Sequence, residues 1–161
     1  MSRVIIEDSR QKLGKHTAKN DAWAAMGLRV VRSKLVVGDY MLVGGTVSVD
    51  TKKDVLELCM DVDQQHERFR GELMLARDCG IQLIVLVENE DGVADLETLS
   101  RWKNPRAAIN RRKGLRPPIS GARLARACKT MEQRYGVRFE FCRPEDAGAR
   151  VIELLEGGNG S

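Results

Sequence analysis

Two aspartates and a lysine occupy strand-like positions in one short segment of the chain. Asp39 precedes a run rich in β-forming residues, and Asp50 and Lys52 close the next such run. Gly44-Gly45 separates the two runs and favours a tight hairpin turn, because both glycines can take positive φ. With those glycines as the loop, Asp39 is paired with Asp50. Lys52 then shares a face of its strand with Asp50, since strand side chains alternate.

This arrangement predicts a metal-dependent hydrolytic site. Opposed residues of a hairpin hold their Cβ atoms about 4.5–5.5 Å apart, and like charges there are destabilising. A divalent cation with hard oxygen ligands would relieve that repulsion. We therefore expect Asp39, Asp50 and the backbone carbonyl of Thr51 to bind Mg²⁺, with Mn²⁺ as a substitute. Such an ion activates water and polarises a phosphate, while Lys52 orients the water or offsets negative charge, which favours phosphodiester hydrolysis.

Each of these residues also has an ordinary structural explanation. Asp39 could be only a turn residue, and Asp50-Thr51-Lys52 could be a solvated strand end. Asp8 follows a short apolar run, and in α/β sheets functional sites gather at strand ends. It is a candidate third acid for the metal, with a turn or helix-capping role as the alternative. Arg10 could contact a phosphate or form a surface ion pair.

The elements that would position these residues alternate between strand and helix. Strands are expected at 4–6, 28–37, in the two arms of the hairpin, at 81–87 and at 137–142, and helices at 17–26, 54–79, 95–102, 122–135 and 144–156, with a break near 61–63. The segment 81–87 is apolar almost throughout, as in a strand buried on both faces. This order predicts an α/β fold with a mixed central β-sheet flanked by helices.

The length of 161 residues suits one domain, expected over 1–156, with a flexible tail at 157–161. The segment 103–121 contains three prolines among arginines and glycines, which predicts a loop or mobile insertion. The four cysteines lack metal-binding spacing and suit a reducing cytosol. The chain shows no signal peptide and no membrane-length apolar run, so a cytoplasmic protein with no membrane partner is expected.

The net charge of +4 comes from one basic segment. Nine of the 27 basic residues lie between 103 and 129, where there is no acidic residue, while the other 18 are outnumbered by 23 acidic ones. A patch of one sign indicates a polyanionic partner. A solubilising face is the alternative, although such faces usually mix both signs. The expected DNA-binding residues are Arg10, Lys103, Arg106, Arg111, Arg112, Lys113, Arg116 and Arg123.

Three motifs in order carry a resemblance to a known family. IEDSR at 6–10, GDY at 38–40 and VDTK at 49–52 resemble the nuclease domain of the XPF-type structure-specific endonucleases, which belong to the PD-(D/E)XK superfamily. The resemblance covers roughly residues 4–87. It implies a restriction-endonuclease-like core, catalytic roles for Asp8, Asp39, Asp50 and Lys52, a homodimer, and branched, flapped or junction DNA as substrate.

The chain departs from the family pattern at several positions. Thr51 stands where the eukaryotic family has arginine, and Gln11 stands where it has glutamate. The acid that follows the lysine in the family is absent or shifted near Leu56 and Glu57. The family's DNA-gripping helix-hairpin-helix module is expected to be missing, and the basic patch is expected to take its place. In this it is similar to stand-alone forms encoded by bacteria and phages.

Together these features predict a Mg²⁺-dependent endodeoxyribonuclease. It would act in DNA repair, recombination or phage DNA processing, in the cytoplasm of a bacterial or phage-infected cell. One alternative is a non-catalytic DNA-structure-binding protein with a decayed nuclease fold, which the change at Thr51 would suit. Another is a nuclease directed at RNA.

Overall fold

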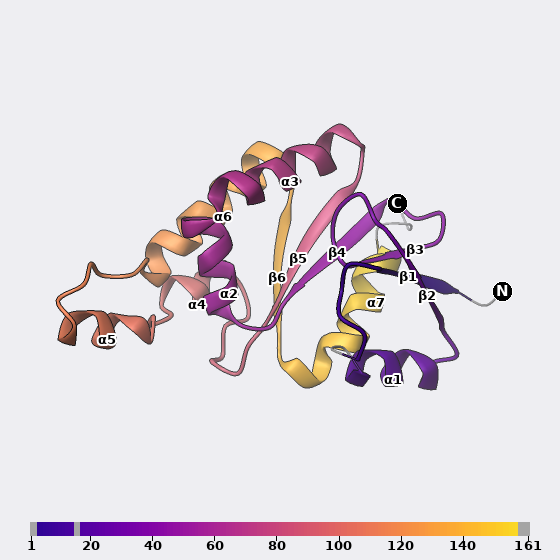
Figure 1. Cartoon of the computed structure of the whole chain (residues 1–161), viewed down its shortest axis with the longest axis horizontal. Coiled ribbons are helices and arrows are strands. Elements are labelled where there is room, and N and C mark those ends of the chain that lie inside the picture. The colour runs from indigo at the N-terminus through magenta and orange to yellow at the C-terminus, as the bar shows by residue number, and fades with distance from the viewer. Residues whose placement is uncertain (1–2, 15–16, 158–161) are drawn as a thin grey trace.

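A six-stranded mixed β-sheet forms the centre of the computed structural model, which describes residues 3–14 and 17–157 (Figure 1). The strands are β1 Val4–Asp8, β2 Arg29–Ser33, β3 Tyr40–Leu42, β4 Val47–Lys52, β5 Gln82–Glu88 and β6 Arg138–Cys142. Their order across the sheet is β2-β1-β3-β4-β5-β6. β3 runs antiparallel to both β1 and β4, and the remaining neighbours are parallel. The predicted mixed α/β sheet is confirmed.

Helices cover both faces of the sheet. On one face lie α2 Val55–Cys59, α3 His66–Asp78, α4 Leu96–Ser100 and α6 Gly121–Tyr135, and on the other lie α1 Thr17–Ala25 and α7 Ala147–Gly157. The apolar strand β5 explains this three-layer arrangement. Its Leu83, Val85 and Val87 side chains enter the first core, while Ile84 and Leu86 enter the second. The strand is buried on both faces, as its sequence predicts.

The β3–β4 hairpin has the predicted register, although its loop is longer than predicted. Met41 is paired with Ser48, as expected from the positions of the glycines. The loop covers residues 43–46, and the Gly45 amide donates to the Leu42 carbonyl at 2.9 Å. Val43 and Thr46, which a two-residue loop would pair, therefore lie within the loop. A symmetric four-residue loop keeps the same register as a two-residue one, so the positions further along the strands are unaffected.

The long helix predicted over 54–79 is interrupted near its middle. Asp54 caps α2 by accepting from the Glu57 amide at 2.8 Å, and a π-helical segment, Met60–Gln64, separates α2 from α3. The interruption falls at the acidic stretch where the sequence predicts a break. One extra residue per turn in a π-helix rotates the side chains that follow it relative to a regular helix.

One predicted strand end is wrong, and one predicted loop contains a helix. β2 ends at Ser33, because residues 34–39 leave the sheet edge and turn back toward β3. The segment 103–121 is not an irregular loop, since it contains α5, Arg106–Arg112, and the prolines flank this helix instead of breaking it. Of the predicted tail, Gly157 ends α7 and residues 158–161 lie outside the described part of the chain.

The segment 103–120, here called the arm, projects from one end of the molecule. Figure 1 shows α5 beyond the edge of the sheet, at the opposite end from α1 and α7. Asn110 fixes the turn after α5, because its side-chain amide donates to the Arg116 carbonyl at 2.9 Å. Separately, none of the helices in the described ranges is long and apolar enough to span a bilayer.

Candidate active site

The backbone of Asp39 is held between two strands. Its amide donates to the Val49 carbonyl of β4 at 2.9 Å, and its carbonyl accepts from the amide of Asp8, the last residue of β1, at 2.8 Å. The regular register ends at Tyr40 and Val49, and the Asp39 amide bonds to the Val49 carbonyl, one residue away from a regular 39–50 pair. The Asp39 side chain nevertheless lies beside that of Asp50. The juxtaposition that the register predicts is therefore present in the fold.

Gly38 allows the chain to enter this position. Its φ is +78°, and a Cβ atom built on it would lie 2.0 Å from the Ser48 hydroxyl oxygen. That hydroxyl donates to the Val37 carbonyl at 2.7 Å, so it cannot move aside without losing a buried hydrogen bond. A side chain at position 38 would both strain the backbone and collide with Ser48.

Thr51 orients the carboxylate of Asp39. The Thr51 amide and hydroxyl both donate to Oδ2 of Asp39, at 2.8 and 3.0 Å. Burial raises the pKa of Asp39, and these hydrogen bonds lower it by only part of that amount. Sequence reasoning assigned Thr51 a carbonyl ligand role, which stays a prediction, and missed the role of its amide and hydroxyl.

Asp50 and Lys52 form an ion pair that includes a third residue. Nζ of Lys52 lies 2.9 Å from Asp50 Oδ2 and 2.5 Å from Asp61 Oδ2. All three side chains are largely buried, with 11% of Lys52, 15% of Asp50 and 17% of Asp61 exposed. Asp61 comes from the π-helical segment. The acidic stretch 61–63 was the available signal in the sequence, but the ion pair joins β4 to the π-helical segment, and local sequence does not place these two elements together.

The pKa values of this cluster are displaced from their ordinary range. Burial, together with the neighbouring Asp39 carboxylate, raises the pKa of Asp50 to about 7. Burial by itself would lower the pKa of Lys52, but the carboxylates of Asp50 and Asp61 outweigh it and raise that pKa. Asp39 and Asp50 lie side by side and titrate as a pair, and burial is the largest cause that raises the pKa of each. Lys52 is a protonated electrostatic partner and not a free base.

Asp8 lies close by, but protein donors occupy both of its carboxylate oxygens. The Leu35 amide donates to Oδ1 at 3.0 Å, and Nε of Arg10 donates to Oδ2 at 2.8 Å. Arg10 also donates to the Leu35 carbonyl at 3.0 Å. These bonds fasten the segment 34–39 to the end of β1. The roles predicted for Asp8 as a third acid and for Arg10 as a phosphate contact stay predictions.

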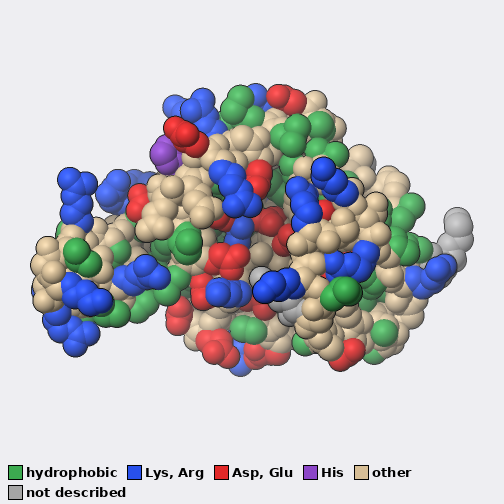
Figure 2. Space-filling model, viewed as in Figure 1, with side chains coloured by type: hydrophobic (Ala, Val, Ile, Leu, Met, Phe, Trp, Pro, Cys, Tyr) green, Lys and Arg blue, Asp and Glu red, His purple; other side chains and the backbone are tan. Residues whose placement is uncertain are grey.

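A cleft of about 510 Å³ opens over the acidic residues. Asp39 and Asp50 lie at its base with Lys52 and Asp61, and α3 supplies Arg68, Glu72 and Leu75. Burial and the nearby Asp50 raise the pKa of Glu72. A second hollow of about 220 Å³ shares Gln11, Asp39, Asp50, Lys52 and Arg68 with the first. Figure 2 shows acidic side chains in the central hollow with basic ones around it.

The donors at the base of the cleft fit a hard divalent cation. Mg²⁺ typically takes one or two carboxylates and completes its shell with water and phosphate oxygens. Asp39 and Asp50 supply two adjacent carboxylates. Burial, and after it the neighbouring Asp39 carboxylate, raises the pKa of Asp50, and a cation between the two would offset both effects. Within the described ranges, no three His, Cys, Asp or Glu side chains are grouped closely enough to hold a metal by themselves. The chain would thus supply only part of the coordination shell.

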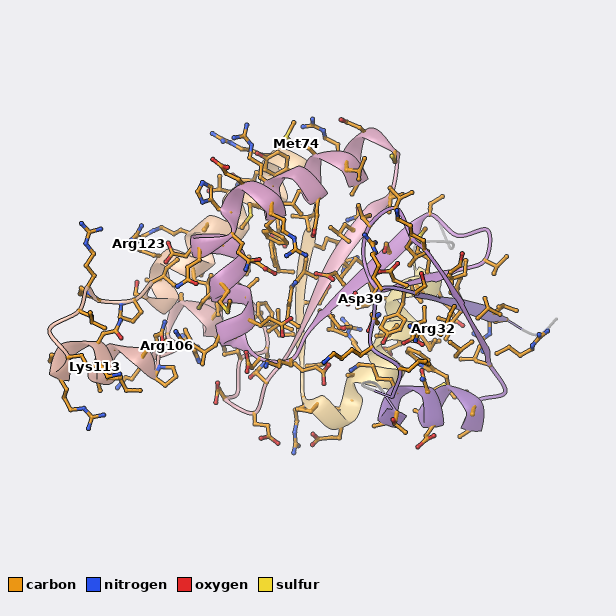
Figure 3. The ribbon with its side chains drawn as sticks, in the orientation of Figure 1. Arg32, Asp39, Met74, Arg106, Lys113 and Arg123 are labelled. Atoms are coloured by element: carbon orange, nitrogen blue, oxygen red, sulfur yellow. The ribbon has the colours of Figure 1, made fainter. Side chains whose placement is uncertain are left out.

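The predicted DNA-binding residues of the basic patch lie apart from the acids. They project from the arm and from α6, as the labelled Arg106, Lys113 and Arg123 show in Figure 3, while Asp39 lies over the sheet. All nine basic residues between 103 and 129 are exposed. None of them is in an ion pair with an acid of the described chain. Their charge is therefore uncompensated within this part of the protein.

The fold has been seen before in proteins of very different sequence. XPF from Aeropyrum pernix superposes with a TM-score of 0.65 at 15% sequence identity, over 98% of this chain and 65% of that chain. The same protein in complex with DNA superposes with a TM-score of 0.62 at 16% identity, over 97% of this chain and 64% of that one. No family model matches the sequence, and neither does any curated protein. The chain has the restriction-endonuclease-like fold of the XPF nuclease and spans about two thirds of its length.

Proposed function

We propose that this protein is a metal-dependent endonuclease that hydrolyses phosphodiester bonds in DNA, with branched, flapped or junction DNA as its preferred substrate. The observation that carries the proposal is the pair of buried carboxylates of Asp39 and Asp50 beside a protonated lysine, at the base of an open cleft. Paired acids without a cation raise the energy of the folded state, so their presence in a cleft favours a site for a divalent cation. The shared fold with XPF, which has been observed in complex with DNA, agrees with this assignment.

The residues of the site have separate tasks in this proposal. Asp39 and Asp50 would hold Mg²⁺, which when bound lowers the pKa of a water molecule and polarises the phosphate. Thr51 fixes the orientation of Asp39 by its two hydrogen bonds. Lys52 keeps its charge because of Asp50 and Asp61, and its ammonium group offsets the negative charge that develops on the phosphate.

The basic patch would hold the DNA outside the cleft. Nine exposed cations without acidic partners can contact phosphates over several base pairs of a duplex, and they carry no sequence information. Because the arm projects from the side of α2 and α6, a duplex bound there would extend away from the acids, and only one strand needs to reach the cleft. A homodimer, which the family resemblance implies, stays a prediction.

The experiment that tests the proposal compares cutting with binding. Labelled flap, Holliday-junction and linear duplex DNA are incubated with the protein in Mg²⁺, in Mn²⁺ and in EDTA, alongside Asp50→Asn. Metal-dependent cutting that Asp50→Asn abolishes, with branched DNA cut fastest, is the expected result. Tight binding without cutting in either metal would identify a non-catalytic DNA-structure-binding protein. Cutting of the matching RNA in preference to DNA would identify a nuclease whose substrate is RNA.

A further inference from the structure

Two of the most exposed aliphatic side chains in the described chain line the cleft that contains the acids. Val36 is 53% exposed and Leu75 is 44% exposed, and both belong to the wall of the cleft. Val36 comes from the segment between β2 and β3, and Leu75 comes from α3, one turn beyond Glu72. Beneath them lie the buried Val37 and Phe69. The cleft therefore combines an apolar wall with a base made of charged groups.

A continuous duplex offers little apolar surface to such a wall. Its outer surface is sugar and charged phosphate, while the flat faces of its bases are stacked on one another. An unstacked nucleotide exposes the face of its base and of its deoxyribose, which can cover aliphatic side chains and release the water on them. Exposed apolar groups gathered in a concave site are typical of ligand contacts.

The charges around the apolar wall suit the phosphates of the same nucleotide. Arg68, from α3, lines both the cleft and the second hollow, so it lies where the two meet above the acids. Its side chain is 74% exposed, and its only ion pair in the described chain is a loose one with Glu72 at 3.6 Å. An exposed ion pair of this kind contributes little stability, so a phosphate can replace Glu72 as the partner of the Arg68 guanidinium. Arg10 and Lys12 line the cleft from the end of β1.

We propose that the cleft is a pocket for one unpaired nucleotide next to the scissile phosphate, with its base and sugar against Val36 and Leu75 and a flanking phosphate on Arg68. This inference rests on the proposed function, and it gives that function a basis for selecting branched DNA. A strand that leaves a duplex at a flap or junction delivers an unpaired nucleotide without further unstacking. A continuous duplex has to unstack one first, at a cost of a few kcal/mol.

The test uses the double variant Val36→Ser with Leu75→Ser, and Val43→Ser as its matched control. Val43 is 60% exposed in the β3–β4 loop and does not line the cleft. In the first measurement, Ca²⁺ replaces Mg²⁺, and binding of a ten-nucleotide thymidine strand is followed by fluorescence anisotropy. We expect the double variant to bind roughly tenfold more weakly, because the apolar contact area is lost, and the control to bind like wild type.

The second measurement follows cutting in Mg²⁺ of two duplexes that differ in one nucleotide at the mapped cut site, which is paired in one and unpaired in the other. Wild type should prefer the unpaired substrate, because the paired one must first unstack a nucleotide. The double variant should cut both substrates more slowly, since both place an unstacked nucleotide against Val36 and Leu75, and the Val43→Ser control should cut both like wild type. Arg68→Ala should lower cutting of both, with Arg70→Ala, on the same helix but outside the cleft, as its control. Thermal unfolding verifies that each variant is folded.

The outcomes separate this inference from the proposed function. Unchanged strand binding by the double variant, or unchanged cutting of the unpaired substrate, would overturn the pocket while leaving the nuclease assignment intact. If no DNA is cut at all, the nuclease assignment fails, and the binding measurement in Ca²⁺ still decides whether the cleft takes an unpaired strand. Weaker dimerisation of the double variant, with strand binding unchanged, would assign the apolar wall to a second copy of the chain and overturn the pocket.

Discussion

Thr51 donates two hydrogen bonds to one carboxylate oxygen of Asp39, from its backbone amide at 2.8 Å and from its hydroxyl at 3.0 Å. Asp39 is on the chain leading into β3 and Thr51 is near the end of β4, so these bonds link the two strands of the hairpin at the acid pair. They leave the Asp39 carboxylate with a single orientation above the base of the cleft. Thr51, which stands where the eukaryotic XPF-type family has arginine, is thus compatible with the proposed metal site, because its side chain orients a carboxylate.

Thr51→Val should lower the affinity for Mg²⁺ without unfolding the protein. The variant keeps the backbone bond and loses the hydroxyl bond to a carboxylate, which is worth about 1.5–3 kcal/mol, or about 10–100-fold in affinity. Thr51→Ser keeps the hydroxyl and should bind nearly like wild type. Isothermal titration with Mg²⁺ measures both, and equal affinities for the valine and serine variants would contradict the role assigned to the hydroxyl.

The acid pair should make the metal-free protein less stable as the pH rises. Folding raises the pKa of Asp50 from 3.8 to about 7, so between these values the folded state holds a proton that the unfolded state has released. The free energy of unfolding therefore falls as the pH rises through this window and stays lower above it. Asp50→Asn removes this effect.

At pH 8 without metal, Asp50→Asn should consequently melt at a higher temperature than wild type, by roughly 2–4 °C for each kcal/mol of relieved repulsion. Near pH 4 the difference between the two proteins should disappear. Adding Mg²⁺ at pH 8 should stabilise wild type and not the variant, because only wild type binds the ion in its folded state. Calorimetry at the two pH values, with and without metal, would refute the assignment if the variant were less stable at pH 8.

Lys52→Met should abolish most cutting, by roughly 10²–10³-fold, because it removes a charge aimed at the reacting phosphate while keeping the length of the side chain. Asp61→Asn should have a smaller effect of about tenfold, since Lys52 keeps its ion pair with Asp50 and loses only the second carboxylate that positions it. Single-turnover cleavage at saturating Mg²⁺ measures both. A larger loss for Asp61→Asn than for Lys52→Met would give Asp61 a direct role in place of a positioning one.

Gly38→Ala should destabilise the fold by more than about 2 kcal/mol, since it combines a positive φ with a collision against Ser48. Gly44→Ala is the matched control on the same hairpin. It has the same φ of +78° with nothing within 4 Å of the added Cβ, so only the backbone cost applies. Urea unfolding of the two variants separates these contributions, and equal losses would exclude the contact with Ser48 as a cause.

The basic patch should make DNA binding depend strongly on salt. Changing Arg111, Arg112 and Lys113 to alanine should reduce the slope of log affinity against log salt by roughly 0.9 for each phosphate contact removed. The exposed Arg134, which lies outside the acid-free stretch, is the control and should leave the slope unchanged when replaced by alanine. Filter binding at several salt concentrations measures the slopes. A flat dependence in wild type would show that the patch is not the DNA contact.

Local pattern determined the elements and the main pairing of this protein. Gly44-Gly45 between two β-rich runs determined the register that brings Asp39 beside Asp50. The apolar run at 81–87 determined a strand buried on both faces, and the acid-free stretch at 103–129 determined the basic patch. These features could be read from the sequence because strand alternation, turn chemistry and charge act between residues close together in the chain.

Tertiary structure decided the rest of the site. Asp61 reaches Lys52 from the π-helical segment, and Glu72 lines the cleft from α3, which packs against β5. Asp8 has its oxygens occupied by Leu35 and Arg10, which depends on where residues 34–39 leave β2. α5 forms where prolines and glycines predicted a loop. Each of these contacts joins residues that are distant in the chain. They depend on packing and burial, so the local sequence could not specify them.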